Sequence, residues 1–381
     1  LRRSRGYVPG SIDLPLSAPR PLLACGAQQK AAFCLARGRR ARVSHHIGDL
    51  EHYPALVAYR DGIEHFERLF ALAPELVAHD LHPGYASTAY ALERAGVETT
   101  AVQHHHAHLA ACLAEHGCVE PAVGAIYDGS GYGPDGTVWG GELLVGDLAS
   151  YERAASLRPV RMPGAAAAVR EPWRMAWAWL AEARGEPPPL PSQLARAVSA
   201  ERWRQVGSIA ASAAVSPATS SMGRLFDAVA ALCGIRAVAT YEGQAAVELE
   251  GWLAPGDGGA YPLPLVREDG RALLDAGALI RAVADDLARG VPVGVVSRRF
   301  HEGVAVATAE TCAGLAELHG LRTVVLSGGV FQNRTLLERT AALLGAAGLR
   351  VLVPERLPPN DGGIAYGQAA VAAARDRAGA I

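Results

Sequence analysis

The chain has 381 residues, of which 50% are hydrophobic, so it can bury a large core distributed over two or three lobes. Its formal net charge of −2 gives no excess of positive charge of the kind that favours DNA or RNA, and no apolar run approaches the roughly 20 residues of a membrane span. We therefore expect a cytoplasmic globular protein that binds neither DNA nor membranes. The six cysteines form no CxxC pair and lie mostly in apolar stretches, which predicts buried thiols.

Strands and helices alternate in the first part of the chain. We predict strands at 22–25, 31–36 and 42–47, a helix at 61–73, a strand at 76–80, a helix at 86–95 and a strand at 98–103. Residues 1–20 are expected to be an extension or linker, and residues 21–120 a first lobe.

One lysine, Lys30, stands among 36 basic residues, in the turn that begins at Gly26. Because every other basic residue is arginine, this position is a candidate for one where an ammonium point charge matters chemically. The alternative is that a single lysine has survived there by chance.

A run of histidines opens the next predicted helix, at 103–116. Four of the 13 histidines fall in five consecutive positions, and His104 and His108 stand four residues apart. On a helix this spacing places both imidazoles on one face, with Cβ atoms about 6 Å apart, close enough to bind one metal ion. The alternative is a solvated or hydrogen-bonded helix start, so a metal site needs acidic ligands from elsewhere. His105 stands where an HExxH zinc protease has Glu, which excludes that class.

The second part of the chain repeats the order of the first. We predict a second lobe at 121–381 with a helical insertion at about 160–240; its strands are expected at 123–128, 137–145, 151–157, 323–326 and 350–353, and its helices at 272–289, 296–319, 332–346 and 362–375. Two such halves are typical of an α/β, actin-like fold, in which two ribonuclease-H-like lobes enclose a nucleotide.

Glycines and aspartates follow the predicted strands of this second lobe. Asp128-Gly129-Ser130-Gly131 comes after one buried strand, and Gly328-Gly329 lies between another strand and a helix. Such glycines let backbone N–H groups approach a phosphate, and an Asp at a strand end is a candidate metal ligand. The alternatives are a glycine hairpin at the first motif and a simple helix N-cap at Asp361.

These motifs together resemble the large C-terminal transferase region of HypF, the carbamoyltransferase family of nickel–iron hydrogenase maturation, which is similar to the threonylcarbamoyl-tRNA transferases. The resemblance covers nearly the whole chain in the family's order. It rests on 26–30, 44–50, 79–83, 102–108, 139–142, 220–227, 241–244, 327–333 and 361–363.

The resemblance implies an actin-like carbamoyltransferase with a divalent metal, Fe(II) or Zn(II), held by residues matching His104, His108, Asp128 and Asp361. It implies transfer of a carbamoyl group from carbamoyl adenylate, made from ATP and carbamoyl phosphate, to the C-terminal cysteine of the partner HypE. Lys30 is expected to meet phosphate charge, and His106 to contact substrate. The residues expected to line the nucleotide pocket are Gly129, Ser130, Gly131, Gly223, Gly328, Gly329 and Asn333. The roles of His105 and His301 stay open between substrate contact and structural hydrogen bonding.

Three alternatives remain. A tRNA threonylcarbamoyl transferase usually has Ser-Gly-Gly-His-Thr where this chain has Asp128-Gly129-Ser130-Gly131-Tyr132. A carbamoyltransferase for a small-molecule hydroxyl would keep both Asp128 and Asp361, so the sequence separates it poorly. A nucleotide-dependent chaperone of the actin-like superfamily would bind ATP without a metal-bound histidine pair. Motifs of the family's acylphosphatase-like, zinc-finger and adenylate-forming domains are not found in the chain, so we expect another domain or protein to supply carbamoyl adenylate.

Overall fold

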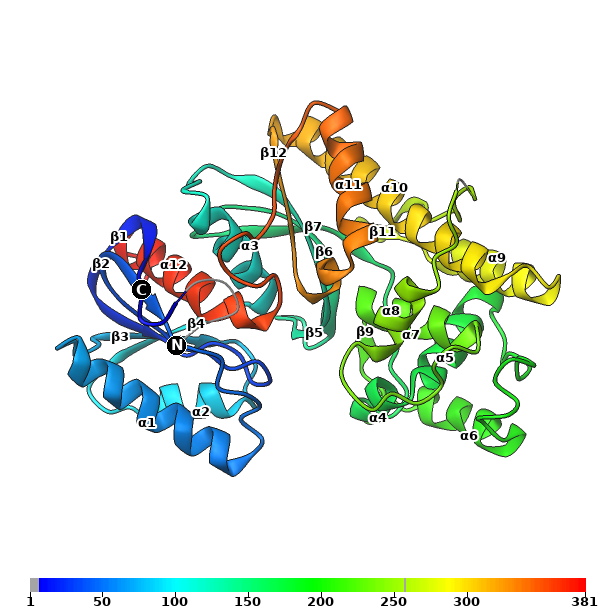
Figure 1. Ribbon diagram of the computed structural model, residues 1–381, viewed down its shortest axis with the longest axis horizontal. Coiled ribbons are helices and arrows are strands. Elements are labelled where there is room, and N and C mark those ends of the chain that lie inside the picture. The colour runs from blue at the N-terminus through cyan, green and yellow to red at the C-terminus, as the bar shows by residue number, and fades with distance from the viewer. Residues whose placement is uncertain (1–6, 257) are drawn as a thin grey trace.

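Two β-sheets flanked by helices form two lobes that lie along the long axis of the molecule (Figure 1). The computed structural model describes residues 7–256 and 258–381. The predicted α/β, actin-like architecture with a helical insertion is confirmed, because each sheet begins with antiparallel strands and continues with parallel ones. Among the described residues, no helix combines the length and the apolar character needed to cross a membrane.

The sheet of the first lobe has the strand order β2-β1-β3-β4. Its strands are β1 (Ile12–Ala24), β2 (Cys34–Val43), β3 (Leu76–Asp80) and β4 (Glu98–Val102), with α1 (Tyr53–Leu69) and α2 (Ala86–Leu92) between them. Strands β1 and β2 are antiparallel, whereas β3 and β4 run parallel to β1.

Two predictions for the first lobe are wrong. Residues 12–20 are part of β1 and not of an extension. The strands predicted at 31–36 and 42–47 are replaced by the single strand β2, because the residues between them do not turn but continue the strand opposite a bulge in β1. Gly38, with a φ of 57°, accommodates that bulge opposite Ala18.

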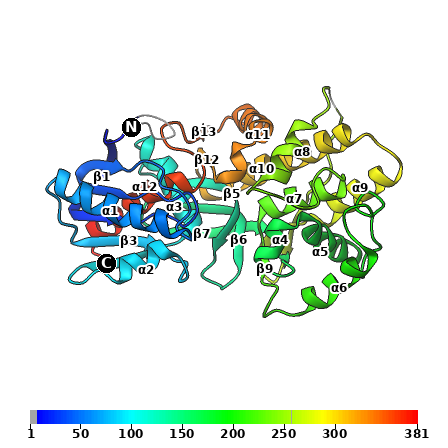
Figure 2. The same cartoon turned by 60° about the horizontal axis from the view of Figure 1, so that its bottom comes forward.

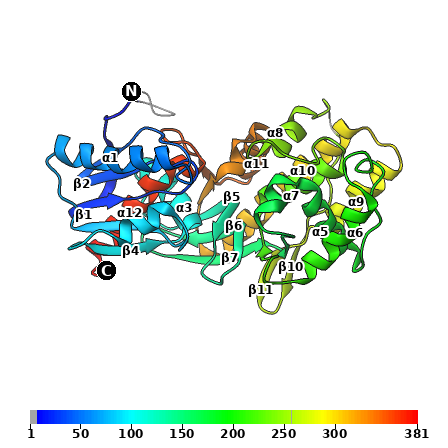
Figure 3. The same ribbon diagram turned by 90° about the horizontal axis from the view of Figure 1, so that it is seen from below.

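The sheet of the second lobe has the order β10-β11-β7-β6-β5-β12-β13, and the short strands β8 and β9 pair beside β6. The strands are β5 (Ala122–Tyr132), β6 (Val138–Gly146), β7 (Tyr151–Leu157), β8 (Val160–Arg161), β9 (Ala218–Thr219), β10 (Leu265–Glu268), β11 (Arg271–Leu274), β12 (Thr323–Ser327) and β13 (Arg350–Leu352). The hairpin β10–β11, at the sheet edge (Figure 3), occupies residues that include the start of the helix predicted at 272–289.

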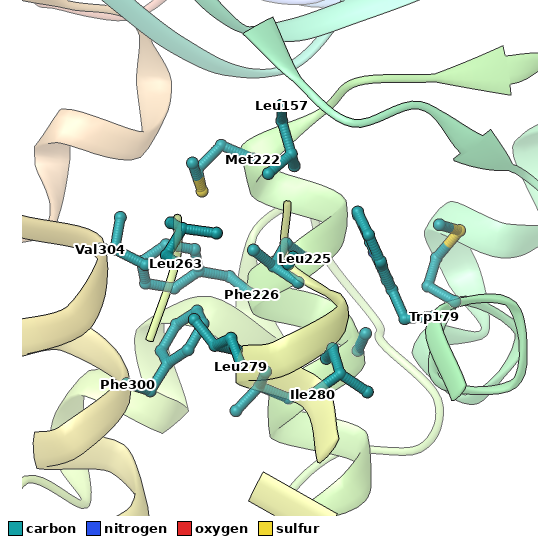
Figure 4. Close-up of a cluster of buried hydrophobic side chains, with 14 of the residues drawn as sticks. Leu157, Trp179, Met222, Leu225, Phe226, Leu263, Leu279, Ile280, Phe300 and Val304 are labelled. Carbon is teal, nitrogen blue, oxygen red and sulfur yellow. The ribbon is translucent and has the colours of Figure 1, made fainter. Parts of the chain in front are cut away.

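Helices inserted after β7 build the largest core. They are α4 (Ala166–Arg170), α5 (Pro172–Arg184), α6 (Ala200–Ala211), α7 (Met222–Leu232), α8 (Gln244–Gly251), α9 (Gly277–Ala288) and the long α10 (Val293–His319), which leads back to the sheet. Apolar side chains of α5, α7, α9 and α10 meet in this core (Figure 4), where Phe226 and Phe300 pack edge to face with ring centroids 4.7 Å apart. The six cysteines are buried free thiols, as predicted.

Two helices lie between the sheets, and each packs across the boundary between the halves of the chain. Helix α3 (His104–Glu115) belongs to the predicted first lobe but also contacts β5, β6 and β12 of the second sheet. Helix α12 (Ile364–Arg377) belongs to the predicted second lobe but packs on β1 and β2 of the first sheet. The two helices contact one another closely (Figure 2). Alternation along the strands explains this layering, because neighbouring residues of a strand face opposite cores: Leu22 faces this central layer and Leu23 faces α1.

The closest approach of α3 and α12 occurs at Gly367. A Cβ atom on this residue would lie 1.9 Å from the backbone oxygen of Ala107. The contact is with backbone and not with a flexible side chain, so only glycine permits this helix spacing. The position of α3, and of the histidines that it carries, therefore depends on Gly367.

We predict that Gly367→Ala destabilises the protein by roughly 3 kcal/mol or more, because the added methyl group must push the two helices apart. The matched control is Gly314→Ala in α10, where a Cβ meets nothing within 4 Å. That change is expected to be neutral or to stabilise by up to about 1 kcal/mol, because alanine is the better helix former. Urea unfolding measures both; equal effects of the two substitutions contradict the packing argument.

Candidate functional site

The first turn of α3 presents the histidine pair. The side chain of Gln103 caps the helix by accepting a hydrogen bond from the backbone N–H of His106, at 2.9 Å. His104 and His108 then lie on the same face, with ring centroids 5.0 Å apart, and both are buried. The predicted helical spacing of the two imidazoles is therefore present.

Two aspartates meet this pair, as the sequence predicted. Asp128 lies in β5, and its Oδ2 is 3.3 Å from Nε2 of His104 and 3.2 Å from Nε2 of His108. Asp361 begins the short 3₁₀ helix Asp361–Gly363 before α12, and its Oδ1 is 3.6 and 3.9 Å from the same two nitrogens. We call these four residues the four-ligand cluster.

The spacing of the donor atoms fits a single divalent ion. One ligand atom from each of the four residues lies within 4.8 Å of the others. Ligands at about 2.1 Å from a tetrahedral ion stand about 3.4 Å from one another, which is close to the separations found here. Two imidazole nitrogens and two carboxylate oxygens suit Fe(II), Mn(II) or Zn(II).

Electrostatics point in the same direction. Although burial alone would lower the pKa of His104, the carboxylates of Asp80, Asp128 and Asp361 raise it well above its ordinary value. Burial would likewise raise the pKa of Asp128, but His104 and His108 lower it well below its usual range. Without an ion, the cluster therefore retains protons to balance buried negative charge, and a cation is the natural replacement for them.

Asp80 contacts the four-ligand cluster but was assigned no role from the sequence. It ends β3 with its side chain fully buried, and its Oδ2 lies 2.8 Å from Nδ1 of His104. Its Oδ1 accepts a hydrogen bond from the backbone N–H of His82, also at 2.8 Å. In neutral His104 the proton is then on Nδ1, which leaves the Nε2 lone pair facing the other ligands. The signal in the sequence that could have identified Asp80 is its position at the end of a predicted strand.

A cavity of about 310 Å³ adjoins the four-ligand cluster, and Asp128 belongs to both. The predicted residues that line it are Lys30, Gly129, Gly223, Gly329 and Asn333. The other three predicted glycine-loop residues lie outside its wall. Ser130 is exposed, Gly131 packs against the ring of His105, and Gly328 packs against the backbone oxygen of Tyr127.

Two further charged side chains line the cavity, Arg224 and Glu242, and neither was assigned a role from the sequence. Lys30 of the first lobe forms an ion pair with Glu242, which precedes α8 in the second. Burial would lower the pKa of Lys30, but Asp361 and Glu242 outweigh burial and raise it, so the ammonium stays charged. Arg224 is buried and pairs with Asp227 at 3.0 Å, while its Nε has no hydrogen-bond partner among the described residues. Both Arg224 and Glu242 fall within motifs of the resemblance.

The other two histidines in the first turn of α3 make structural contacts. His106, expected to contact substrate, instead lies against Tyr151 with its Nε2 2.9 Å from the backbone oxygen of Asp147, and burial lowers its pKa to about 4. It points away because a residue two positions from a helical pair faces the opposite side. His105 lies 3.1 Å from the Gln103 amide nitrogen.

His301 is also accounted for. Its Nδ1 donates to the backbone oxygen of Ser297 at 2.8 Å, and its Nε2 accepts from the side-chain amide of Asn333 at 2.8 Å. The amide oxygen of Asn333 caps α11 (Arg334–Ala346) by accepting from the N–H of Leu336. His301 therefore orients Asn333 at the cavity wall.

We predict that Asp80→Asn weakens the binding of Zn(II) by about 10- to 100-fold, because the neutral amide holds the His104 tautomer less firmly. Competition with a coloured chelator measures the affinity. Asp61→Asn, at an exposed position of α1, is the control and is expected to bind as wild type does. Unchanged affinity in Asp80→Asn contradicts the assigned role.

Comparisons with known proteins identify the family to which the chain is similar. The family models described as "HypF Kae1-like domain" and "Carbamoyltransferase, Kae1-like Domain, second subdomain" match residues 17–115 and 124–368. Carbamoyltransferase HypF2 of Cupriavidus necator is 42% identical over 98% of the chain and 49% of its own length. The chain thus spans about half the length of that relative.

Two further proteins are similar over most or all of the chain. The HypF homolog of Cupriavidus necator is 38% identical over 93% of the chain and 91% of its own length. The crystal structure of full-length HypF in the phosphate- and nucleotide-bound form superposes with a TM-score of 0.92 and 39% identity, covering 100% of this chain and 59% of that one. The chain therefore belongs to the HypF carbamoyltransferase family.

Proposed function

We propose that the chain transfers a carbamoyl group from carbamoyl adenylate to the C-terminal cysteine thiol of HypE during nickel–iron hydrogenase maturation. The observation that carries this proposal is the position of Asp128, which belongs to the four-ligand cluster and also lines the cavity. A nucleotide held in the cavity would place its acyl-phosphate end beside that cluster. The phosphate- and nucleotide-bound form of full-length HypF supports a nucleotide ligand.

The cavity wall supplies charges of the kind that a phosphate needs. Lys30 and Arg224 are the cationic side chains among its lining residues. Lys30 is paired with Glu242, so a phosphate oxygen that reaches Lys30 replaces one anionic partner by another. The hydrogen bond from its side-chain amide to His301 fixes the orientation of Asn333 in the cavity wall.

The transfer step balances as follows. The acceptor thiol loses its proton to solvent, its sulfur forms a bond to the carbamoyl carbon, and the bond from that carbon to the phosphate oxygen breaks as AMP leaves with the electron pair. Lys30 stabilises the negative charge that grows on the departing phosphate. A divalent ion, Fe(II) or Zn(II), held by the four-ligand cluster would polarise the carbamoyl carbonyl as a Lewis acid. Asp80 would keep His104 oriented throughout.

We further propose that carbamoyl adenylate, made from ATP and carbamoyl phosphate, is supplied by an adenylate-forming domain or protein. That unit and HypE are the two partners that this proposal requires.

The test uses synthetic carbamoyl adenylate and a peptide that ends in cysteine. We expect the zinc- or iron-loaded chain to release AMP and form the S-carbamoyl peptide, and the His104→Ala/His108→Ala variant to be at least about 100-fold slower, as loss of several kcal/mol of electrostatic stabilisation requires. His65→Ala, at an exposed site on α1, is the control. Equal metal content and equal transfer rates in wild type and the double variant would overturn the proposal.

A further inference from the structure

The last residue of α3 carries a buried carboxylate. The helix begins with the metal-ligand candidates His104 and His108, and it ends at Glu115, whose side chain is only 1% exposed. A glutamate is disfavoured at this end of a helix, where the helix dipole is negative. Burial also raises the pKa of this carboxyl. Because both the helix dipole and burial disfavour a charged carboxylate at this position, Glu115 needs specific hydrogen-bond partners.

Those partners are backbone groups of the segment that leads to Asp361. Oε1 of Glu115 accepts from the N–H of Glu355 at 2.6 Å, and Oε2 accepts from those of Arg356 and Leu357 at 3.2 and 3.1 Å. The neighbouring His116 donates through Nε2 to the backbone oxygen of Val353 at 2.8 Å. The C-terminal end of α3 thus holds the chain that emerges from β13.

The same segment is fixed a second time just before Asp361. The N–H of Gly328, at the end of β12, donates to the backbone oxygen of Pro359 at 3.0 Å. The side chain of Asn360 donates to Gln332 at 3.2 Å. These contacts, together with those of Glu115, fix the path of residues 355–360. The position of the Asp361 carboxylate depends on that path.

We propose that Glu115 is a positioning residue for Asp361: by holding the segment 355–357 it places the Asp361 carboxylate opposite the histidines of the same helix. Helix α3 then supplies two ligands at one end and the anchor for a third ligand at the other. This inference rests on the proposed function, because it takes the four-ligand cluster to be a metal site.

A second metal site is the competing interpretation of these residues. Cys112, Glu115 and His116 have ligand atoms close enough to share an ion. However, both oxygens of Glu115 and Nε2 of His116 are engaged with backbone groups, and burial raises the pKa of the Cys112 thiol well above its usual range. A metal ligand needs free lone pairs and a thiolate. Glu115 and His116 therefore anchor the backbone of the segment that leads to Asp361 and do not form a second metal site.

The test measures metal affinity, not transfer. Glu115→Gln keeps the shape of the side chain but turns an amide NH₂ toward backbone N–H groups, so Asp361 is expected to shift and Zn(II) affinity to fall about tenfold. The Co(II)-loaded variant should show an altered visible spectrum. Glu317→Gln, at an exposed position of α10, is the control and is expected to leave affinity and spectrum unchanged. If Glu115→Gln does not fold, the test uses Glu115→Asp, whose side chain is one methylene too short to reach the backbone N–H groups of 355–357.

A double-mutant cycle separates positioning from general destabilisation. In an Asp361→Asn background, Glu115→Gln should cost little further affinity, because the ligand that it positions is already gone. Wild-type affinity in Glu115→Gln, or the same loss in both backgrounds, would overturn the inference while leaving the proposed function intact. Failure of the wild-type chain to bind Zn(II) or Co(II) at all would overturn the proposed function and this inference together.

Discussion

Negative charge buried beside two imidazoles is the constraint on which the rest of the structure depends. Three carboxylates, from Asp80, Asp128 and Asp361, meet His104 and His108 in a region where Asp80 and His104 are fully buried. Isolated buried charges are costly, so this arrangement is stable only with protons or a cation to balance it. The cluster therefore places a structural demand on the fold, and it is also the group that we propose to hold a metal ion.

The fold meets this demand by bringing ligands from distant parts of the sequence to one point. Asp80 ends a strand of the first sheet, Asp128 lies in a strand of the second, and Asp361 precedes the final helix. Helix α3 lies between the sheets, packed against α12 through the glycine contact at Gly367. The metal-ligand candidates and the cavity are thus located where the two lobes meet, and motion of one lobe against the other would alter both.

Local pattern was enough to predict the elements near the site. Residues 76–80 and 151–157 form strands with the predicted bounds, and the helix predicted at 103–116 differs from α3 by one residue at each end. Helix α3 has a capping residue, Gln103, and the two strands are short runs bounded by other elements. The bulge in β1 opposite Gly38 and the hairpin β10–β11 were missed, because a bulged strand and a turn have similar composition and short edge strands carry little signal.

The candidate site was predicted in part for the same reason. His104 and His108 followed from spacing, and Asp128 and Asp361 from their strand ends together with the family resemblance. The prediction for His106 overlooked that a residue two positions from the pair faces the other side of the helix. Its partner Asp147, in the turn after β6, is distant in sequence. Asp80 lies at the end of a predicted strand, but its role depends on a partner 24 residues away in another element, so the strand end alone did not identify it.

Anomalous X-ray diffraction from crystals of the chain loaded with Fe(II) or Zn(II), recorded at the absorption edge of each metal, tests the central claim most directly. The account predicts one strong peak among Nε2 of His104, Nε2 of His108 and the carboxylates of Asp128 and Asp361. A peak elsewhere, for example beside Cys112 and His116, or no peak with the metal in excess, would contradict it.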